Sequence, residues 1–261
     1  MPTCQRVKID TLSIQIFPTN QELGNAAGGE AVRGIRRAVR ERGAANIILA
    51  TGNSQLMFLA AMRRAAGIPW ERVRVFHMDE YVGLDPQHPA SFANFLHRNL
   101  LDQVQPLAFY PVLGATLEPE RSCREYEALL REYPADLCVL GIGENGHLAF
   151  NDPPYADFRD PTWVKMVRLA EASRIQQVGE GHFASITDVP AHAISLTIPA
   201  LLAARQILAV VPEARKARAV YLALREPVSA ECPASILRLS QNATLFLDVH
   251  SAAQAFPVAV R

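Results

Sequence analysis

The stretch that decides the fold is NIILATGNSQLMFLAAMRRAAG, residues 46–67. After Asn46, residues 47–50 are apolar without polar alternation, which predicts a strand over residues 46–50 that is buried on both faces. A glycine-containing loop follows. The pattern of residues 55–66 then predicts a helix that Ser54 caps and Gly67 ends. A strand, a loop and a helix in this order form the unit from which parallel sheets covered by helices are built.

The same order recurs along the rest of the chain. Further strands are predicted at residues 12–17, 73–77, 135–141, 206–211 and 244–249. Further helices are predicted from the capping box at Thr19 and Glu22 to Gly43, and at residues 91–101, 118–132 and 213–224. The predicted fold class is therefore α/β: a doubly wound, mostly parallel, Rossmann-like sheet with helices on both faces.

We expect one domain over residues 1–261, because the chain shows no internal repeat, low-complexity tract or linker. Within it, residues 151–190 are predicted to be a loop region that could act as a lid. Residues 178–190 are its most mobile part by composition. The most apolar stretch, residues 193–211, is interpreted as a helix followed by a strand. Polar residues interrupt it, so it does not predict a membrane span.

The composition argues against several classes of partner. The chain has 26 Lys and Arg against 26 Asp and Glu, so its formal net charge is zero. Proteins that bind nucleic acid through phosphates need a surplus of basic residues on one face, and none is predicted here. The four cysteines form no CxxC pair, and the N-terminus lacks the apolar core of a signal peptide. We expect a reduced, cytoplasmic protein with neither a nucleic-acid nor a membrane partner.

Ligands of open parallel sheets bind beyond the carboxyl ends of the strands, so the loops there are the first candidates. The loop of residues 51–54 leads directly into a helix, whose free N–H groups and positive end would suit a phosphate. Gly52 permits close approach, Thr51 and Ser54 offer hydroxyls, and Asn53 lies between them. The alternative is an ordinary turn between a strand and a helix with a serine cap.

Two adjacent carboxylates, Asp79 and Glu80, follow another buried strand. Their backbone directions differ, so one could face a pocket while the other braces the loop. A carboxylate held against an apolar wall has a raised pKa and can act as a general base near neutral pH. The alternative is a pair of acids in a solvated turn.

The third loop contains GIGENGH, residues 141–147, which matches the GxGxxG pattern of dinucleotide-binding proteins. That fingerprint needs a helix after its third glycine, and the sequence NDPP of residues 151–154 does not allow one. Gly143 is instead expected to bring the backbone close to a small substrate. His147, near Asn145 and Asp152, is a candidate for proton transfer, with a structural histidine as the alternative.

No metal is predicted, because the histidine spacing fits no metal motif. A metal site assembled in space from His77, Asp79 and His147 is the weaker alternative. The other histidines are interpreted as structural.

Together the three loops resemble the glucosamine-6-phosphate deaminase family. The similarity is strongest in FHMDEYVGLDPQHPASFANFLHRNLLD, residues 76–102, and in GIGENGHLAFNDPP, residues 141–154. The 6-phosphogluconolactonases share the fold, but MDEYVGL and HLAFNDPP look like the deaminase branch. The resemblance implies a doubly wound α/β fold. It also implies a cofactor-free enzyme that converts glucosamine 6-phosphate and water into fructose 6-phosphate and ammonium.

The resemblance also implies roles for single residues. Asp79 would take the C2 proton of the opened sugar and return it at C1, and His147 would help to open the ring, with Asn145 and Asp152 beside it. The substrate-binding set implied in this way comprises Thr51, Gly52, Asn53, Ser54, Glu80, Gly143 and Lys216.

The chain departs from the family pattern at several positions. Asn145 replaces an aspartate, Asp152 replaces a glutamate, and Asn53 and Gln55 change the phosphate loop. An arginine that follows the family's lid has no clear match, and Arg174 or His182 are candidates to replace it. The regulatory residues of allosteric members are not recognisable in residues 155–165. These departures leave open a different amino-sugar phosphate, a non-catalytic sugar-phosphate sensor, or a 6-phosphogluconolactonase-type hydrolase. The oligomeric state, including a homo-oligomer, is also open.

Overall fold

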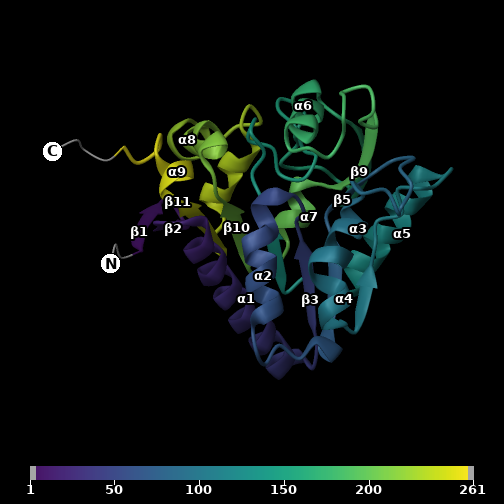
Figure 1. Cartoon of the computed structure of the whole chain (residues 1–261), viewed down its shortest axis with the longest axis horizontal. Coiled ribbons are helices and arrows are strands. Elements are labelled where there is room, and N and C mark those ends of the chain that lie inside the picture. The colour runs from purple at the N-terminus through teal and green to yellow at the C-terminus, as the bar shows by residue number, and fades with distance from the viewer. Residues whose placement is uncertain (1–3, 258–261) are drawn as a thin grey trace.

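An eight-stranded sheet forms the centre of the molecule (Figure 1). This computed structural model describes residues 4–257, so residues 1–3 of the N-terminal stretch and residues 258–261 lie outside the described part. The strand order is β1-β2-β11-β10-β7-β3-β4-β6. Every neighbouring pair is parallel except β1 and β2. The strands are β1 Gln5–Ile9, β2 Leu12–Phe17, β3 Ala45–Leu49, β4 Val73–His77, β6 Ala108–Tyr110, β7 Leu137–Leu140, β10 Ile207–Val211 and β11 Ala243–Asp248.

Helices cover both faces of this sheet, which confirms the doubly wound α/β prediction. One apolar layer contains the buried sides of α1 Asn20–Arg42, α2 Leu56–Arg64 and α3 Phe92–Leu96. These helices lie in front of the sheet in Figure 1. The opposite layer contains residues of α5 Pro119–Glu132, α7 Ile198–Leu202 and α8 Ala217–Arg225. The chain also forms the short helices α4 Asp102–Val104 and α9 Val249–Ala252. Each central strand contributes side chains to both layers, and this explains why its sequence shows no polar alternation.

The end signals of the first helix act as predicted, but those of the second do not. The Thr19 hydroxyl accepts a hydrogen bond from the Glu22 N–H at 3.1 Å, and α1 ends at Gly43 with φ of +81°. Ser54 is not a helix cap. A 3₁₀ turn over Asn53–Gln55 precedes α2, and no side chain caps the helix. Gly67 lies two residues beyond the cap of α2 rather than at it.

A second sheet of three antiparallel strands, in the order β5-β9-β8, corrects two predictions. Its strands are β5 Asp79–Tyr81, β8 Val164–Arg168 and β9 His192–Leu196. The segment 193–211, interpreted from its sequence as a helix followed by a strand, does contain α7 and β10, but β9 precedes them, because an apolar run does not distinguish a buried strand from a buried helix. The predicted loop region 151–190 contains β8 and the helix α6 Glu171–Gly179.

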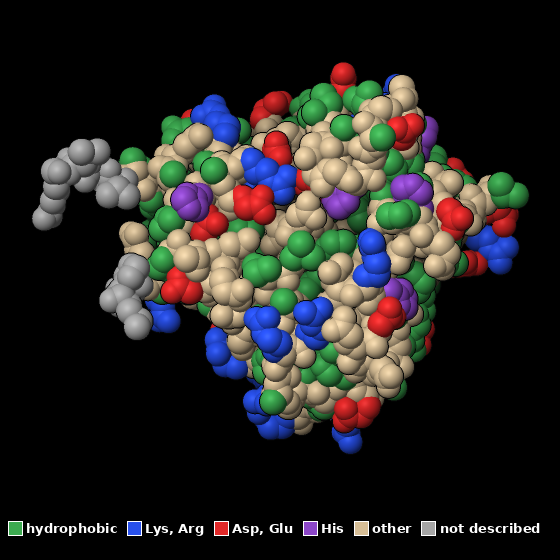
Figure 2. Space-filling view, viewed as in Figure 1, with side chains coloured by type: hydrophobic (Ala, Val, Ile, Leu, Met, Phe, Trp, Pro, Cys, Tyr) green, Lys and Arg blue, Asp and Glu red, His purple; other side chains and the backbone are tan. Residues whose placement is uncertain are grey.

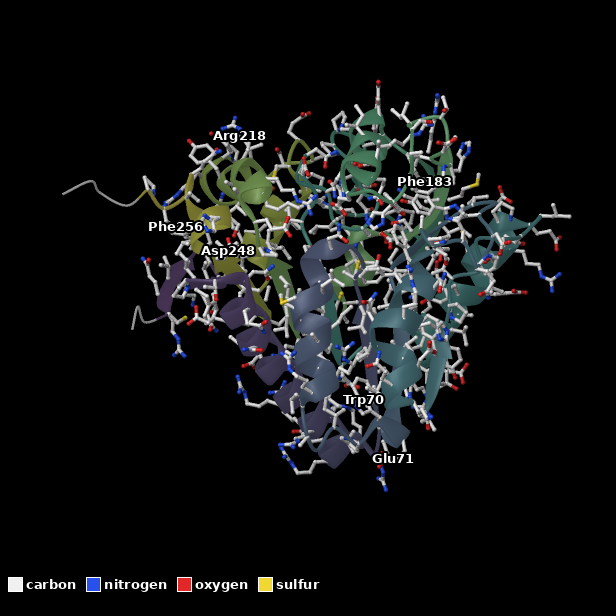
Figure 3. The ribbon with its side chains drawn as sticks, viewed as in Figure 1. Trp70, Glu71, Phe183, Arg218, Asp248 and Phe256 are labelled. Atoms are coloured by element: carbon white, nitrogen blue, oxygen red, sulfur yellow. The ribbon has the colours of Figure 1, made fainter. Side chains whose placement is uncertain are left out.

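The small sheet lies beyond the carboxyl ends of the large one, close to α6 at the top of Figure 1. An aromatic cluster fixes it there: the ring centroid of Tyr81 is 4.8 Å from that of Phe92 and 5.4 Å from that of Phe183. Figure 3 shows Phe183 beside α6. The turn after α6 is thereby packed against β5.

The surface carries charges of both signs. On the face shown in Figure 2, Lys and Arg side chains gather over α1 and α2, as expected for the solvated side of an amphipathic helix. Acidic side chains are interspersed over the rest of this face. Within residues 4–257, no helix combines the length and the apolar character needed to cross a membrane.

Candidate active site

The three loops meet in one cleft at the carboxyl ends of β3, β4 and β7. Seven of the residues predicted from the sequence line it: Thr51, Gly52, Ser54, Asp79, Gly143, His147 and Lys216. The remaining wall includes Phe92 and Phe150, together with Gln176, Gln177 and Glu180 from α6 and the turn that follows it. The sequence did not predict this last group, because it did not predict α6.

The loop of residues 51–54 leaves β3 with Gly52 at φ of +94°, a conformation that favours glycine. Lys216 reaches the same end of the cleft from the turn before α8 and is 3 % exposed. Burial lowers the pKa of Lys216, while the nearby charge of Glu180 acts against that shift. Within the described part of the chain, Lys216 makes no ion pair within 4 Å, so its ammonium group is available to an anion in the cleft.

Asp79 and Glu80 point in different directions, as the alternating sides of a strand require. The Asp79 carboxyl lines the cleft. Burial, with a contribution from the negative charge of Glu80, raises its pKa to about 8. This shift keeps the carboxyl close to its protonation midpoint at neutral to slightly alkaline pH, where it can both accept and return a proton.

Glu80 lies outside the cleft and braces the start of α3. Its carboxylate accepts hydrogen bonds from the Ser91 hydroxyl at 2.8 Å and from the Phe92 and Ala93 N–H groups at 3.2 and 3.0 Å. One carboxylate therefore faces the pocket and the other braces the loop. The structure does not bring Glu80 into contact with the space where a substrate would lie.

His147 is held by a group of polar side chains behind its ring. Its Nδ1 lies 3.1 Å from Asp152 Oδ1 and 3.1 Å from the Ser173 hydroxyl, which also donates a hydrogen bond to Asp152. Asn145 donates to Asp152 Oδ1 at 2.9 Å, and its own Oδ1 accepts from the His147 N–H at 3.1 Å. Asn145 thus orients Asp152 and the backbone rather than the imidazole ring.

The Asp152 carboxylate stays ionised in this arrangement. Burial alone would raise its pKa, but the hydrogen bond and charge of His147, with the hydrogen bonds of Ser173 and Asn145, lower that pKa to about 2. An ionised acceptor at Nδ1 holds the proton on that nitrogen and leaves Nε2 to exchange protons in the cleft. Ser173 lies on α6, and no motif in the sequence pointed to it.

Gly143 makes room for the imidazole ring. A Cβ atom added at this position would lie 2.2 Å from His147 Cε1 and 2.3 Å from Nε2. The sequence predicts that Gly143 brings the backbone close to a substrate. It does line the cleft, but the more direct reason for a glycine here is the ring that lies over it.

We expect Gly143→Ala to lower the free energy of unfolding by about 1–3 kcal/mol, because the added methyl group must displace the His147 ring. Chemical denaturation of both proteins measures this difference. Gly179→Ala is the matched control, since a Cβ there meets no atom within 4 Å and should leave stability unchanged or slightly higher. An equal effect at the two positions would contradict the steric explanation.

Three further candidates from the sequence lie outside the cleft. Asn53 donates a hydrogen bond to the Glu180 carbonyl at 3.2 Å and so links the loop of residues 51–54 to the turn after α6. Arg174 donates to the backbone carbonyls of Ile186 and Val189. The His182 Nε2 lies 3.4 Å from Glu180 Oε2.

The alternative metal site is not formed. His77 accepts a hydrogen bond from the Val112 N–H through its Nε2 at 2.7 Å, and burial lowers its pKa to about 3. Within residues 4–257, no group of three or more His, Cys, Asp or Glu side chains is arranged to hold a metal ion.

Comparison with known proteins gives a consistent result. Residues 18–246 match the family described as glucosamine-6-phosphate isomerases/6-phosphogluconolactonase. A glucosamine-6-phosphate deaminase of Exiguobacterium sibiricum is 36% identical over 214 residues, which cover 82% of each chain. One of Bacillus cereus is 34% identical over 237 residues, covering 91% of this chain and 87% of the other.

Solved structures share the fold. A monomeric glucosamine-6-phosphate deaminase superimposes with a TM-score of 0.84 at 28% identity, covering 92% of this chain and 99% of the other. The 6-phosphogluconolactonase of Trypanosoma brucei superimposes with a TM-score of 0.77 at 20% identity, covering 97% of this chain and 100% of the other. At that identity the second comparison bears on the fold alone.

Proposed function

This chain belongs to the glucosamine-6-phosphate isomerase/6-phosphogluconolactonase family, and on that basis we propose that it is a glucosamine-6-phosphate deaminase. The reaction converts glucosamine 6-phosphate and water into fructose 6-phosphate and ammonium. One observation favours the deaminase reaction over the lactonase reaction of the same family. The buried carboxyl of Asp79 lines the same cleft as the loop of residues 51–54 and His147, and its pKa is raised to about 8. Moving a proton between two carbons requires such a base.

The 6-phosphate is assigned to the loop of residues 51–54 and to Lys216. Backbone N–H groups at the start of a helical turn suit a phosphate, and Gly52 permits its close approach. The Thr51 and Ser54 hydroxyls can donate further hydrogen bonds, and Lys216 supplies a positive charge. Asn53 supports this site from outside by holding the loop against the turn after α6.

Ring opening is assigned to His147. Asp152 keeps the proton on Nδ1, so Nε2 can take the proton of the sugar's O1 hydroxyl and pass a proton to the ring oxygen. Because Asn145 is neutral, Asp152 is the carboxylate that stabilises the imidazolium form, and Asn145 and Ser173 fix the position of Asp152.

Asp79 is assigned the isomerisation step. Its ionised carboxylate takes the proton from C2 of the open-chain aminoaldose, the electron pair forms a C1–C2 double bond, and O1 gains a proton from the substrate's own ammonium group, which gives an enolamine. The carboxyl then returns the proton to C1, which produces the imine of the ketose. Water hydrolyses this imine and releases ammonia. Glu80 serves this step from outside the cleft, because it anchors α3 and adds to the shift of the Asp79 pKa.

The proposal is tested by incubating the purified protein with glucosamine 6-phosphate and measuring both ammonia and fructose 6-phosphate. We expect the two products in equal amounts, without added metal or nucleotide. The same preparation is assayed on 6-phosphogluconolactone, whose hydrolysis needs the phosphate site but no C2 base. Turnover of the lactone alone would assign the cleft to the lactonase reaction. Binding of the amino sugar without any product would indicate a sensor.

Lys216→Gln is expected to raise KM for glucosamine 6-phosphate about tenfold to a hundredfold, which is the contribution of one or two hydrogen bonds to a charged group. The value of kcat should change much less, because Lys216 is assigned to the phosphate and not to the carbons that react. Steady-state kinetics separate the two parameters. Lys165→Gln is the control, since Lys165 pairs with Asp160 away from the cleft. An unchanged KM in Lys216→Gln would exclude Lys216 from the phosphate site.

A further inference from the structure

A carboxylate of the protein itself lies at the phosphate loop. Glu180 follows α6, and its Oε2 lies 3.6 Å from the position that a Cβ of Gly52 would occupy. The Glu180 side chain is 5 % exposed and lines the cleft together with Thr51, Ser54 and Lys216. Its Oε1 accepts hydrogen bonds from Gln176 at 2.8 Å and from Arg215 at 2.9 Å. The loop that suits a phosphate therefore has an anion beside it already.

This carboxylate is ionised. Burial by itself would raise its pKa, but the hydrogen bond of His182 and the charges of Arg215 and Lys216 lower that pKa to about 2. Two anions repel each other strongly in a cleft shielded from water. A phosphate dianion at Gly52 would meet this negative charge at close range, so the two groups compete for the same cations.

Arg215 is the cation that such competition would release. Its guanidinium joins Glu180 at 2.9 Å and Glu213 at 2.6 Å, with Glu144 at 3.4 Å. Of these three carboxylates, Glu180 is the one that lines the cleft. Arg215 also adjoins Lys216 in the chain, so both cations approach the phosphate loop from the same turn before α8.

The backbone around Glu180 permits it to move. Glu180 stands between Gly179 and Gly181, and a Cβ at either glycine would meet no atom within 4 Å. Gly181 has φ of +80°, a backbone conformation that glycine adopts with little strain. The two flanking glycines therefore place no side chain in the way of a displacement of Glu180.

We propose that Glu180 is a competing anion that the phosphate of the substrate displaces, and that Arg215, once released from Glu180, becomes a second phosphate-binding cation beside Lys216. This inference rests on the proposed function for the identity of the substrate as a phosphate ester. It makes the Glu180–Arg215 pair a determinant of specificity, since a sugar without a phosphate cannot take the place of Glu180 on the guanidinium.

Binding of inorganic phosphate, measured by isothermal titration calorimetry, tests the proposal without turnover. Glu180→Gln keeps the shape of the side chain but removes the competing charge, so we expect phosphate to bind about threefold to tenfold more tightly than to the unmodified protein. Arg215→Gln should weaken phosphate binding about tenfold. Arg218→Gln is the matched control, because Arg218 lies over the Tyr221 ring at the outer side of α8 (Figure 3) and should leave binding unchanged.

Three results would overturn the proposal: weaker or unchanged phosphate binding in Glu180→Gln, unchanged binding in Arg215→Gln, or no phosphate binding in any of the proteins at millimolar concentration. A rise in KM for glucosamine 6-phosphate in Glu180→Gln, without a change in phosphate binding, would instead assign Glu180 to the substrate's ammonium group. Circular dichroism verifies that the variants are folded.

A crystal structure of the unmodified protein with inorganic phosphate gives a second test that needs no variant. We expect Arg215 within hydrogen-bond distance of a phosphate oxygen and Glu180 withdrawn from Gly52. Phosphate bound in the loop with the Glu180–Arg215 pair intact would contradict the inference. A protein that binds phosphate in this way but releases no ammonia would refute the proposed function and leave the inference standing.

Discussion

Replacing Asp79 by asparagine is expected to lower kcat for glucosamine 6-phosphate by about 10²-fold to 10⁴-fold, the usual contribution of a positioned general base. Asparagine keeps the size of the side chain but cannot take the C2 proton. Ammonia release at saturating substrate measures the loss. Phosphate binding should be unchanged, because the 51–54 loop is not altered. Full activity in Asp79→Asn would assign the proton transfer to another residue.

The pH dependence of the unmodified enzyme provides a second measurement of the same group. Asp79 must be ionised to act as a base, so kcat/KM should rise with pH through a midpoint of about 8, the raised pKa, and level off at higher pH. Glu80→Gln is the informative control. It removes the negative charge that contributes to the shift, so the rise should move to lower pH while the plateau rate changes little.

The stability of Asp79→Asn should change in the direction opposite to its activity. The pKa of this carboxyl is raised in the folded protein above its unfolded value of 3.8, so the folded state holds a proton that the unfolded state has lost. The contribution of Asp79 to stability is therefore present below pH 3.8 and is lost as pH rises toward 8. Asp79→Asn should raise Tm, with a gap that widens from about pH 5 to about pH 8. A lowered Tm would point to structural damage as the cause of lost activity.

Replacing His147 by glutamine is expected to lower kcat by about 10²-fold, because ring opening then lacks its proton carrier. The glutamine side chain is still polar, so KM and phosphate binding should change little. His250→Gln, on the exposed side of helix α9, is the control and should keep full activity. An equal rate in His147→Gln would mean that the ring opens without enzymatic help before the base acts.

Asn145 stands where the family pattern has an aspartate, and its contacts show what the amide does there. Its amide donates to the same Asp152 oxygen that lies beside His147 Nδ1. An aspartate at position 145 would place a second carboxylate beside Asp152, where like charges raise a pKa. In this chain the neutral amide is therefore compatible with an ionised Asp152, and Asn145→Asp would not simply restore the family's arrangement.

The sequence predicted most of the large sheet because its strands are buried on both faces. Runs such as residues 207–211 leave no polar residue to suggest another structure. β5 and β6 contain three residues each, and β8 alternates buried and exposed positions without a strong apolar signal. Helix α6 begins without a side-chain cap, so nothing in its sequence marked its start.

The sequence predicted those parts of the site that follow directly after parallel strands, because ligands bind beyond the carboxyl ends of such strands. That rule brought together Gly52, Asp79 and His147, which are far apart in the sequence. It could not decide which of Asp79 and Glu80 faces the cleft, because that depends on the pairing of β5 with β9. Nor could it find Ser173 or Glu180, since their helix was not predicted and their contacts cross more than 20 residues of chain.

The two ends of the cleft are carried by different sheets. The loop of residues 51–54 leaves β3 of the large sheet, whereas Asp79 is carried by β5 of the small one, where Tyr81 packs against Phe92 and Phe183. With the terminal phosphate at that loop and Asp79 as the base, as proposed, the second carbon of the sugar must reach from one sheet to the other. A pentose phosphate, which is one carbon shorter, would then place the wrong carbon opposite Asp79.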